Sequence, residues 1–187
     1  MSRTTFIILM SSIAVLAFVG MWIAWRGRAK RDAAAAGSAP AAPVLAGEAL
    51  ASFARASYVS TTPEGAPLER VAIPGLRYKG YADVTVQRDG VTIAVTGEAP
   101  VTIPAAQVRG TDVAGGRIGK AVEPGGLSIL RWSLPAPGGE PRALESSFRL
   151  ADPAEQGRFA AAIAQLVSSA DADTQTNSTH PTIQEEA

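Results

Sequence analysis

The feature that most constrains this chain is an uncharged stretch near its N-terminus. No charged side chain occurs from Thr4 to Trp25, a run of 22 residues dominated by Leu, Ile, Val, Phe and Met. As an α-helix with about 1.5 Å rise per residue, this run would reach roughly 33 Å, which is enough to cross a hydrocarbon core about 30 Å thick. The sequence therefore predicts that residues 4–25 contact a lipid bilayer as a transmembrane anchor, within an anchor segment of residues 1–31.

The residues at the end of this stretch support the same interpretation. Trp22 and Trp25 lie where indole rings favour the headgroup zone of a bilayer. Four positive charges follow within six residues: Arg26, Arg28, Lys30 and Arg31. Because Lys and Arg beside a membrane segment favour the cytoplasm, we expect a single-pass plasma (cell) membrane protein with its N-terminus outside. The alternative, a cleaved secretory signal, has a shorter apolar region of about 7–15 residues and positive charge before it.

Two low-complexity segments frame the rest of the chain. Residues 32–52 are rich in Ala with two prolines and show no apolar period, which predicts a flexible linker. Residues 169–187 are rich in Ser, Thr, Asp, Gln and Glu, which predicts a disordered acidic and polar tail. One domain, residues 53–168, is then expected between them on the cytoplasmic side.

The clearest local structure in this domain is a β-hairpin. Valine and isoleucine alternate with other residues on both sides of Asp89-Gly90, the favoured dipeptide of a two-residue turn. With that turn, Val86 would lie opposite Ile93 and Val84 opposite Val95, on one buried face. The sequence therefore predicts an antiparallel hairpin over residues 82–95.

Further strands and one helix complete the pattern. Alternation predicts strands in residues 100–104, 127–134 and 143–150, and more weakly in 57–61 and 68–73. Asp152-Pro153 then provides an N-cap and a proline at the first helical position, and apolar residues from Phe159 to Val167 recur at helical spacing. This order predicts a mainly β domain, an antiparallel curved sheet or barrel closed by a C-terminal amphipathic helix.

Several segments carry a resemblance to a known family. They are residues 58–62, 68–71, 82–95, 103–106, 116–123 and 125–127. With the preceding anchor and basic cluster, they resemble the actinobacterial membrane-anchored proteins with a PH-like domain, an uncharacterised family. The resemblance implies a PH-like barrel of about seven strands capped by a helix, and it carries no activity with it.

The residue inventory argues against catalysis. The chain has no cysteine, and its one histidine, His180, lies in the polar tail, so neither thiolate chemistry nor a Ser-His-Asp arrangement is expected in the domain. The glycine-rich segment ending at Lys120 lacks the first glycine and the final Ser or Thr of a phosphate loop. The scattered carboxylates are expected to be solvated: Glu69, Asp83, Glu98, Asp112, Glu123 and Glu145. We therefore expect no enzyme, no cofactor, no metal and no small-molecule substrate.

Binding remains the expected role. The 17 basic and 17 acidic residues cancel, so no global charge favours nucleic acid. Two basic clusters in the domain are candidates for contacting an anion or a lipid headgroup: Arg70, Arg77 and Lys79, then Arg117 and Lys120 together with Arg109. Scattered surface charge is the alternative interpretation. The leading hypothesis is a membrane-tethered, non-catalytic adaptor that binds a protein partner; sensing of anionic lipid headgroups and a structural role in a membrane complex are alternatives.

Overall fold

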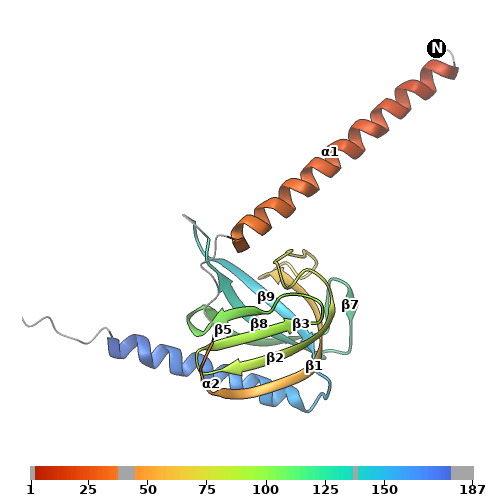
Figure 1. Cartoon of the computed structure of the whole chain (residues 1–187). Coiled ribbons are helices and arrows are strands. Elements are labelled where there is room, and N and C mark those ends of the chain that lie inside the picture. The colour runs from red at the N-terminus through yellow and green to blue at the C-terminus, as the bar shows by residue number, and fades with distance from the viewer. Residues whose placement is uncertain (1–2, 38–44, 137–138, 178–187) are drawn as a thin grey trace, which may run out of the picture.

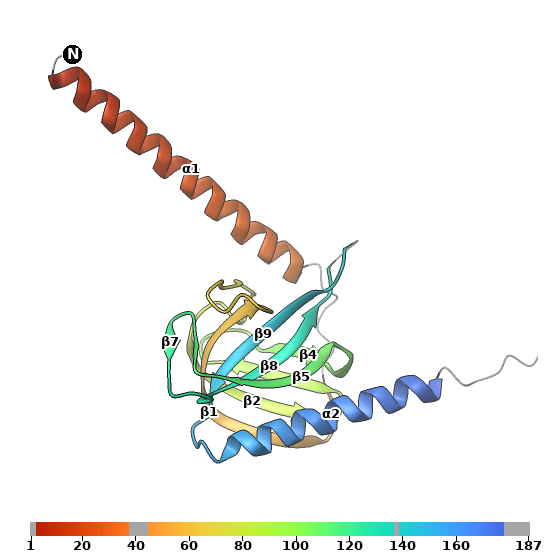
Figure 2. The same cartoon turned by 180° about the vertical axis from the view of Figure 1, so that it is seen from behind.

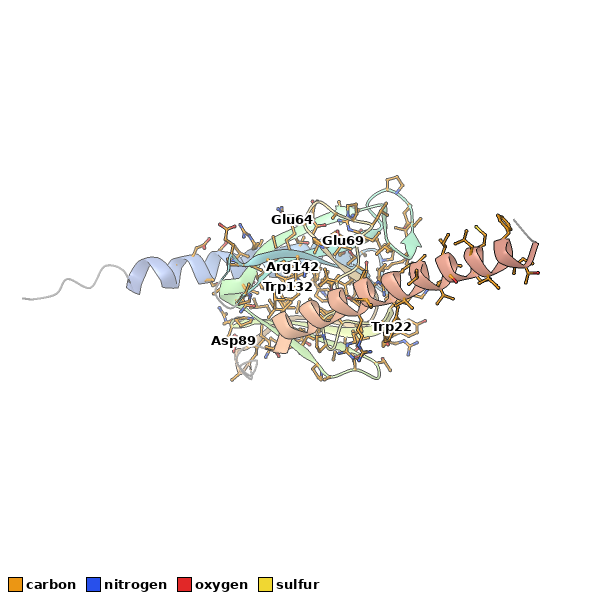
Figure 3. All side chains as sticks on the ribbon, turned by 90° about the horizontal axis from the view of Figure 1, so that it is seen from above. Trp22, Glu64, Glu69, Asp89, Trp132 and Arg142 are labelled. Atoms are coloured by element: carbon orange, nitrogen blue, oxygen red, sulfur yellow. The ribbon has the colours of Figure 1, made fainter. Side chains whose placement is uncertain are left out.

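The computed structural model describes residues 3–37, 45–136 and 139–177. Helix α1 (Arg3–Gly37) contains an apolar window, Phe6–Ala24, that is long enough to cross a membrane. None of the side chains in this window is buried, and they project from all sides of the helix (Figure 3). A surface that is apolar all round needs a nonpolar surrounding, and a membrane span and a signal sequence both have this property.

The domain is built on one seven-stranded antiparallel sheet that curls around its core (Figure 1). The sheet order is β4-β3-β2-β1-β9-β8-β5, and a two-stranded hairpin of β6 and β7 stands apart from it. The strands are β1 (Ala49–Pro63), β2 (Gly80–Gln87), β3 (Gly90–Val95), β4 (Val101–Pro104), β5 (Val108–Ala114), β6 (Gly116–Arg117), β7 (Lys120–Ala121), β8 (Leu127–Leu134) and β9 (Arg142–Arg149). A 3₁₀ turn, η1 (Ala105–Gln107), joins β4 to β5.

The bent strand β1 and helix α2 (Glu155–Asn177) close the curved sheet around the hydrophobic core. The first half of β1 pairs with β2 and its second half with β9, and register shifts in both pairings let the strand bend. Helix α2 packs against β5, β1, β2 and η1 (Figure 2). Phe159 of α2 lies 5.5 Å from the ring of Phe53 and 6.4 Å from that of Phe148. The predicted fold, a curved antiparallel sheet closed by a C-terminal helix, is confirmed.

A chain of hydrogen bonds crosses the core beside these rings. The Tyr58 hydroxyl donates to the Leu76 carbonyl (3.0 Å) and lies 2.9 Å from Thr61 Oγ1. Ser146 Oγ lies 2.8 Å from Thr61 Oγ1 and accepts from Trp132 Nε1 at 3.0 Å. Burial raises the pKa of Tyr58 to about 12, although the hydrogen bond with Thr61 works in the opposite direction. The chain links β1, β8, β9 and the loop after β1, so it fixes how these strands pack.

The β2–β3 hairpin forms as predicted, but its register differs by two residues. Val86 lies opposite Val91 and Val84 opposite Ile93, so the turn residues are Arg88 and Asp89. Gly90 already belongs to β3, where the Ile103 carbonyl of β4 would lie only 2.3 Å from any Cβ. A shift of two residues leaves the same side chains facing inward, which is why alternation alone could not detect it.

Other element boundaries also differ from the predictions. Residues 68–73, predicted as a weak strand, form a loop whose Val71 N–H donates to the Thr61 carbonyl. Strand β5 was not predicted, because it is an edge strand with a register shift at Gly110 and no clear alternation. Strand β1 begins at Ala49, inside the range expected as linker, and α1 continues to Gly37. Helix α2 starts two residues later than predicted and extends to Asn177, into the range expected as a disordered tail, whose last ten residues lie outside the described ones.

Candidate functional site

Three separate segments of the domain surround a surface cleft of about 590 Å³. One wall is the middle of β1, the second is the start of β2, and the third is the turn between β6 and β7. The lining residues are Ser57, Tyr58, Val59, Lys79, Gly80, Tyr81, Gly119 and Lys120. The third wall is held in place because the Ile118 N–H donates to the Pro67 carbonyl, 3.0 Å away in the loop after β1. Figure 1 shows this loop and β7 on the same side of the domain.

Two of the predicted anion contacts, Lys79 and Lys120, lie in this cleft. Lys120 Nζ donates to Ser57 Oγ at 3.2 Å, which holds the ammonium group over the β1 wall. Lys79 is exposed, and neither lysine has a carboxylate partner within salt-bridge distance among the described residues. The structure therefore brings together two cations that are 41 residues apart in the sequence.

Arg70 lies beside the cleft, and its guanidinium group joins β1 to the loop that follows it. Its Nη2 donates to the Val59 carbonyl at 3.0 Å, and its Nη1 donates to the Arg77 carbonyl at 3.3 Å. The Val59 carbonyl needs this donor because the ladder between β1 and β2 ends at Tyr58. The guanidinium still contributes charge to the cleft, since its Nη2 lies 3.5 Å from the position of a Cβ on Gly119. Arg77 itself is exposed in the same loop.

Arg117 is not free to contact an anion or a lipid headgroup, as the sequence had suggested. Its Nη2 donates to Glu145 Oε2 at 2.9 Å, and the two side chains are only 12% and 11% exposed. Glu145, expected on a solvated surface, is instead buried beneath the segment that carries β6 and β7. The pair joins this segment to the outer face of β9, and Arg109 lies exposed on β5 outside the cleft. Of the six predicted contacts, Lys79 and Lys120 line the cleft, Arg70 and Arg77 lie beside it, Arg109 is exposed outside it, and Arg117 is held in a largely buried ion pair.

Sequence reasoning missed the apolar side chains around the cleft. Leu68, Tyr78 and Tyr81 are exposed by 77%, 69% and 56%. Tyr81 lines the cleft, Tyr78 precedes Lys79, and Leu68 follows Pro67, the residue bonded to the β6–β7 turn. We call these three residues the apolar rim. Leu68 belongs to a segment predicted as a weak strand and Tyr81 belongs to β2, so no pattern in the sequence marks these residues as one group.

Charge around the cleft is unbalanced. Among the residues that line it, none carries a carboxylate. Glu145 is paired with Arg117, Asp83 Oδ1 accepts the N–H of Arg55 at 2.9 Å, and Glu69 is exposed in the loop after β1. The Arg55 guanidinium stacks on the ring of Tyr81 at 4.8 Å, which adds a further cation at the rim. The arrangement can attract an anion or an acidic surface.

Outside this cleft, the described residues show little chemistry. No three His, Cys, Asp or Glu side chains within residues 3–37, 45–136 and 139–177 lie close enough to hold a metal ion, and His180 lies outside these ranges. On α1, the Arg26 guanidinium lies 5.5 Å from the ring centre of Trp22. The side chains of Trp25, Arg28, Lys30 and Arg31 lie outside the described ones, so their predicted contacts with lipid stay predictions.

The point where the chain enters the domain is also well defined. Asp89 Oδ2 accepts the N–H groups of Ala46 (2.7 Å) and Gly47 (2.8 Å), and Arg88 pairs with Glu48 at 3.2 Å. Partial desolvation would raise the pKa of Asp89, but these backbone hydrogen bonds outweigh it and lower the pKa below its usual value. The chain coming from α1 is thus attached to the β2–β3 turn, at the opposite end of β2 from the cleft.

Comparison with known proteins identifies a family model that matches more than half of the chain. A family model described as "Bacterial PH domain-like" matches residues 36–164. No curated protein matches the chain. Among solved structures, a chain of the 8S snRNP assembly intermediate is similar over 78% of this chain and 94% of that chain, with 12% identity and a TM-score of 0.43.

Proposed function

This chain belongs to the bacterial PH domain-like family, and from this premise we propose that it is a membrane-tethered, non-catalytic binding module that recognises a protein partner. Helix α1 would be the anchor, with the N-terminus outside and the domain at the cytoplasmic face of the plasma membrane. The basic cluster after Trp25 supports this orientation. A PH-like domain agrees with a binding role, and the residues gathered at the cleft suggest recognition rather than bond-breaking chemistry.

The observation that carries this proposal is the combination of exposed aromatic rings and unpaired cations around one cleft. Tyrosine and arginine are enriched where proteins bind one another, because they offer large contact areas and hydrogen bonds together. The apolar rim provides two tyrosines, and Arg55, stacked on Tyr81, and the exposed Arg77 provide arginines beside them. Exposed apolar side chains grouped on one surface are typical of interaction sites.

The anchor would keep this surface near the bilayer. From Ala24, α1 continues for 13 residues to Gly37, which is about 20 Å of helix. The nine residue steps from Gly37 to Ala46 span at most about 30 Å even if fully extended. The attachment point at Asp89 therefore lies within roughly 50 Å of the end of the apolar window. A partner at or near the membrane surface is within reach.

Photo-crosslinking tests the proposal in native membranes. A photoreactive phenylalanine analogue replaces Tyr78 in the full chain, and the same analogue at Val113, 59% exposed on β5, is the matched control. We expect a discrete protein adduct from position 78 that disappears when Leu68 and Tyr81 are replaced by serine, and none from position 113. Equal adducts at both positions, or no adduct at position 78, would contradict the proposal.

A second candidate function, sensing of an anionic lipid headgroup, is favoured by one specific observation. Lys79 and Lys120 line the same cleft and lack carboxylate partners among the described side chains. Cations near a bilayer gain about 1 kcal/mol each from anionic lipids. Both candidates make the cleft the functional surface, and they differ in what it contacts.

A further inference from the structure

We infer that the connection between β5 and β8, residues 115–126, is a hinged flap that opens and closes while the rest of the domain stays folded. This segment, called the flap from here on, carries Gly119 and Lys120. The closed flap therefore forms the third wall of the cleft, and the open flap removes that wall. The inference rests on the proposed binding role of the cleft and adds how access to this surface is regulated.

The contacts of the flap show which part of the sheet it covers. Glu145, Ser147 and Arg149 are alternate residues of β9, so they lie on one face of the sheet. Arg117 of the flap pairs with Glu145 at 2.9 Å. Glu123, also in the flap, pairs with Arg149 at 2.9 Å. Ser147, between these two ion pairs, therefore lies beneath the flap.

The first argument for opening is that the closed flap covers hydroxyl groups that have no hydrogen-bond partner. Ser147 is fully buried, and its hydroxyl group has no partner among the described residues. The same holds for Ser60, directly opposite Ser147, and for Thr62 on the same face of β1. Buried polar groups without partners are rare, because each has lost its hydrogen bonds with water. Opening returns these hydroxyl groups to water, which offsets part of the free energy that opening costs.

The second argument is that the flap is weakly attached. None of residues 115–126 is fully buried, and β6 and β7 pair with each other rather than with the seven-stranded sheet. The Ile118 N–H donates to the Pro67 carbonyl, and Val122 packs against the small cluster of Val59, Leu127 and Ile129. Segments with few buried apolar contacts open at a lower free energy than the core. We therefore expect the flap to open well before the domain unfolds.

The third argument is the geometry of the base of the flap. The ladder between β5 and β8 ends at the pair Ala114 and Leu127, so both ends of the flap leave the sheet at one place. Two glycines lie at each end, in residues 115–116 and 125–126, and Gly125 has a φ of +76°. A hinge needs a few residues that absorb a change in backbone angles. Rotation about this base breaks no strand pair of the main sheet.

Thiol labelling tests the inference directly, because the native chain has no cysteine. Ser147→Cys places a nearly isosteric thiol beneath the flap. Ser146→Cys places one at the neighbouring position, where the serine faces the core and bonds Trp132. Both serines are fully buried, so each thiol reacts only after an opening. The full chain in phosphatidylcholine nanodiscs is treated with iodoacetamide at a series of urea concentrations, and labelling is followed by mass spectrometry.

We expect Ser147→Cys to react at least about tenfold faster than Ser146→Cys without urea, at a rate that hardly depends on urea. Opening of the flap exposes little surface, whereas Ser146→Cys should react through global unfolding, which urea favours steeply. In the Ser147→Cys chain, Val122→Ala should speed labelling about fivefold, because it removes apolar contact between the flap and the sheet. Val113→Ala, at an exposed position on β5, is the matched control and should change the rate less than about twofold.

Several results would overturn the inference. They are equal labelling rates at positions 146 and 147, no labelling at position 147, a rate at 147 that rises with urea as steeply as at 146, and equal effects of the two valine substitutions. Near-UV circular dichroism shows whether each variant is folded, and Ser60→Cys, opposite Ser147 in the register, repeats the test if Ser147→Cys is not. Labelling needs no partner, so the flap can be established when the crosslink at Tyr78 fails, and the reverse.

Discussion

Replacing Arg117 by methionine tests whether this residue is a structural or a ligand-binding cation. Arg117 and Glu145 are about nine-tenths buried, with their charged atoms 2.9 Å apart. Removing one partner of a buried ion pair typically costs 3–5 kcal/mol, because the other charge stays buried without a partner. Arg131, opposite Glu145 in the β8–β9 register, can compensate part of that charge. We therefore expect Arg117→Met to lower the free energy of unfolding by about 3 kcal/mol, the lower end of this range.

The double variant Arg117→Met, Glu145→Leu should recover most of this loss. Replacing a whole buried pair by apolar side chains of similar size is often neutral, since no charge is left desolvated. The assay is urea unfolding of the full chain in detergent, in a Trp22→Phe, Trp25→Phe background. The chain has three tryptophans, so Trp132 in the core is then the only fluorescent one. A loss below about 0.5 kcal/mol for Arg117→Met, as for exposed pairs, would refute this account.

Three further predictions concern pH, the chain entry and topology. Burial raises the pKa of Tyr58 to about 12 from 10.0, so the unfolded state loses this proton first and the free energy of unfolding should fall by roughly 2 kcal/mol from pH 10 to 12. Tyr58→Phe should remove this part in pH-dependent urea unfolding. Asp89→Ala should speed amide hydrogen exchange at Ala46 and Gly47, because their N–H groups lose the carboxylate that accepts their hydrogen bonds. In the unsubstituted chain, the same hydrogen bonds should weaken as pH falls through the lowered pKa of Asp89. Unchanged exchange in Asp89→Ala would mean that Asp89 does not hold the chain entry. A topology reporter fused after Ala187 should show cytoplasmic activity, and activity on the outer side would reverse the proposed orientation.

Much of the fold could be predicted because inward-facing residues repeat with a clear period. Val84 and Val86 alternate in β2, and Phe159, Ile163 and Leu166 recur on one face of α2. Each pattern indicates one buried face of a strand or helix. A sheet covered by a helix is a simple way to bury these faces against each other. The hairpin register escaped prediction because a two-residue shift keeps every inward-facing residue inward, and tertiary contacts at Asp89 and Gly90 decide it.

The outer face of β1 and β9 shows where alternation misleads. Ser60, Thr62, Ser147 and Glu145 occupy positions that the pattern assigns to solvent, yet all four are buried. The segment from Gly115 to Gly126, rich in glycine, folds over this face, and Val122 and Ala114 pack on a second small apolar cluster there. No local sequence pattern predicts that a loop will cover a polar face of the sheet.

The candidate site was predictable only in part, for a similar reason. Sequence spacing grouped Arg117 with Lys120, but the β6–β7 turn directs one toward Glu145 and the other toward Ser57. Conversely, Lys79 and Lys120 lie far apart in the chain and meet because the Ile118 N–H fixes this turn against Pro67. Which cations share a surface is a property of tertiary structure, and composition does not report it.

Hydrogen exchange of the full chain in native membranes tests the central proposal, that the cleft is the functional surface of a tethered module. Exchange would be compared between native membranes and phosphatidylcholine nanodiscs. The account predicts slower exchange in native membranes for residues 57–59, 79–81 and 119–120, which line the cleft, with little change in β5. Protection absent from these three segments, or as large in residues 108–114, would contradict it.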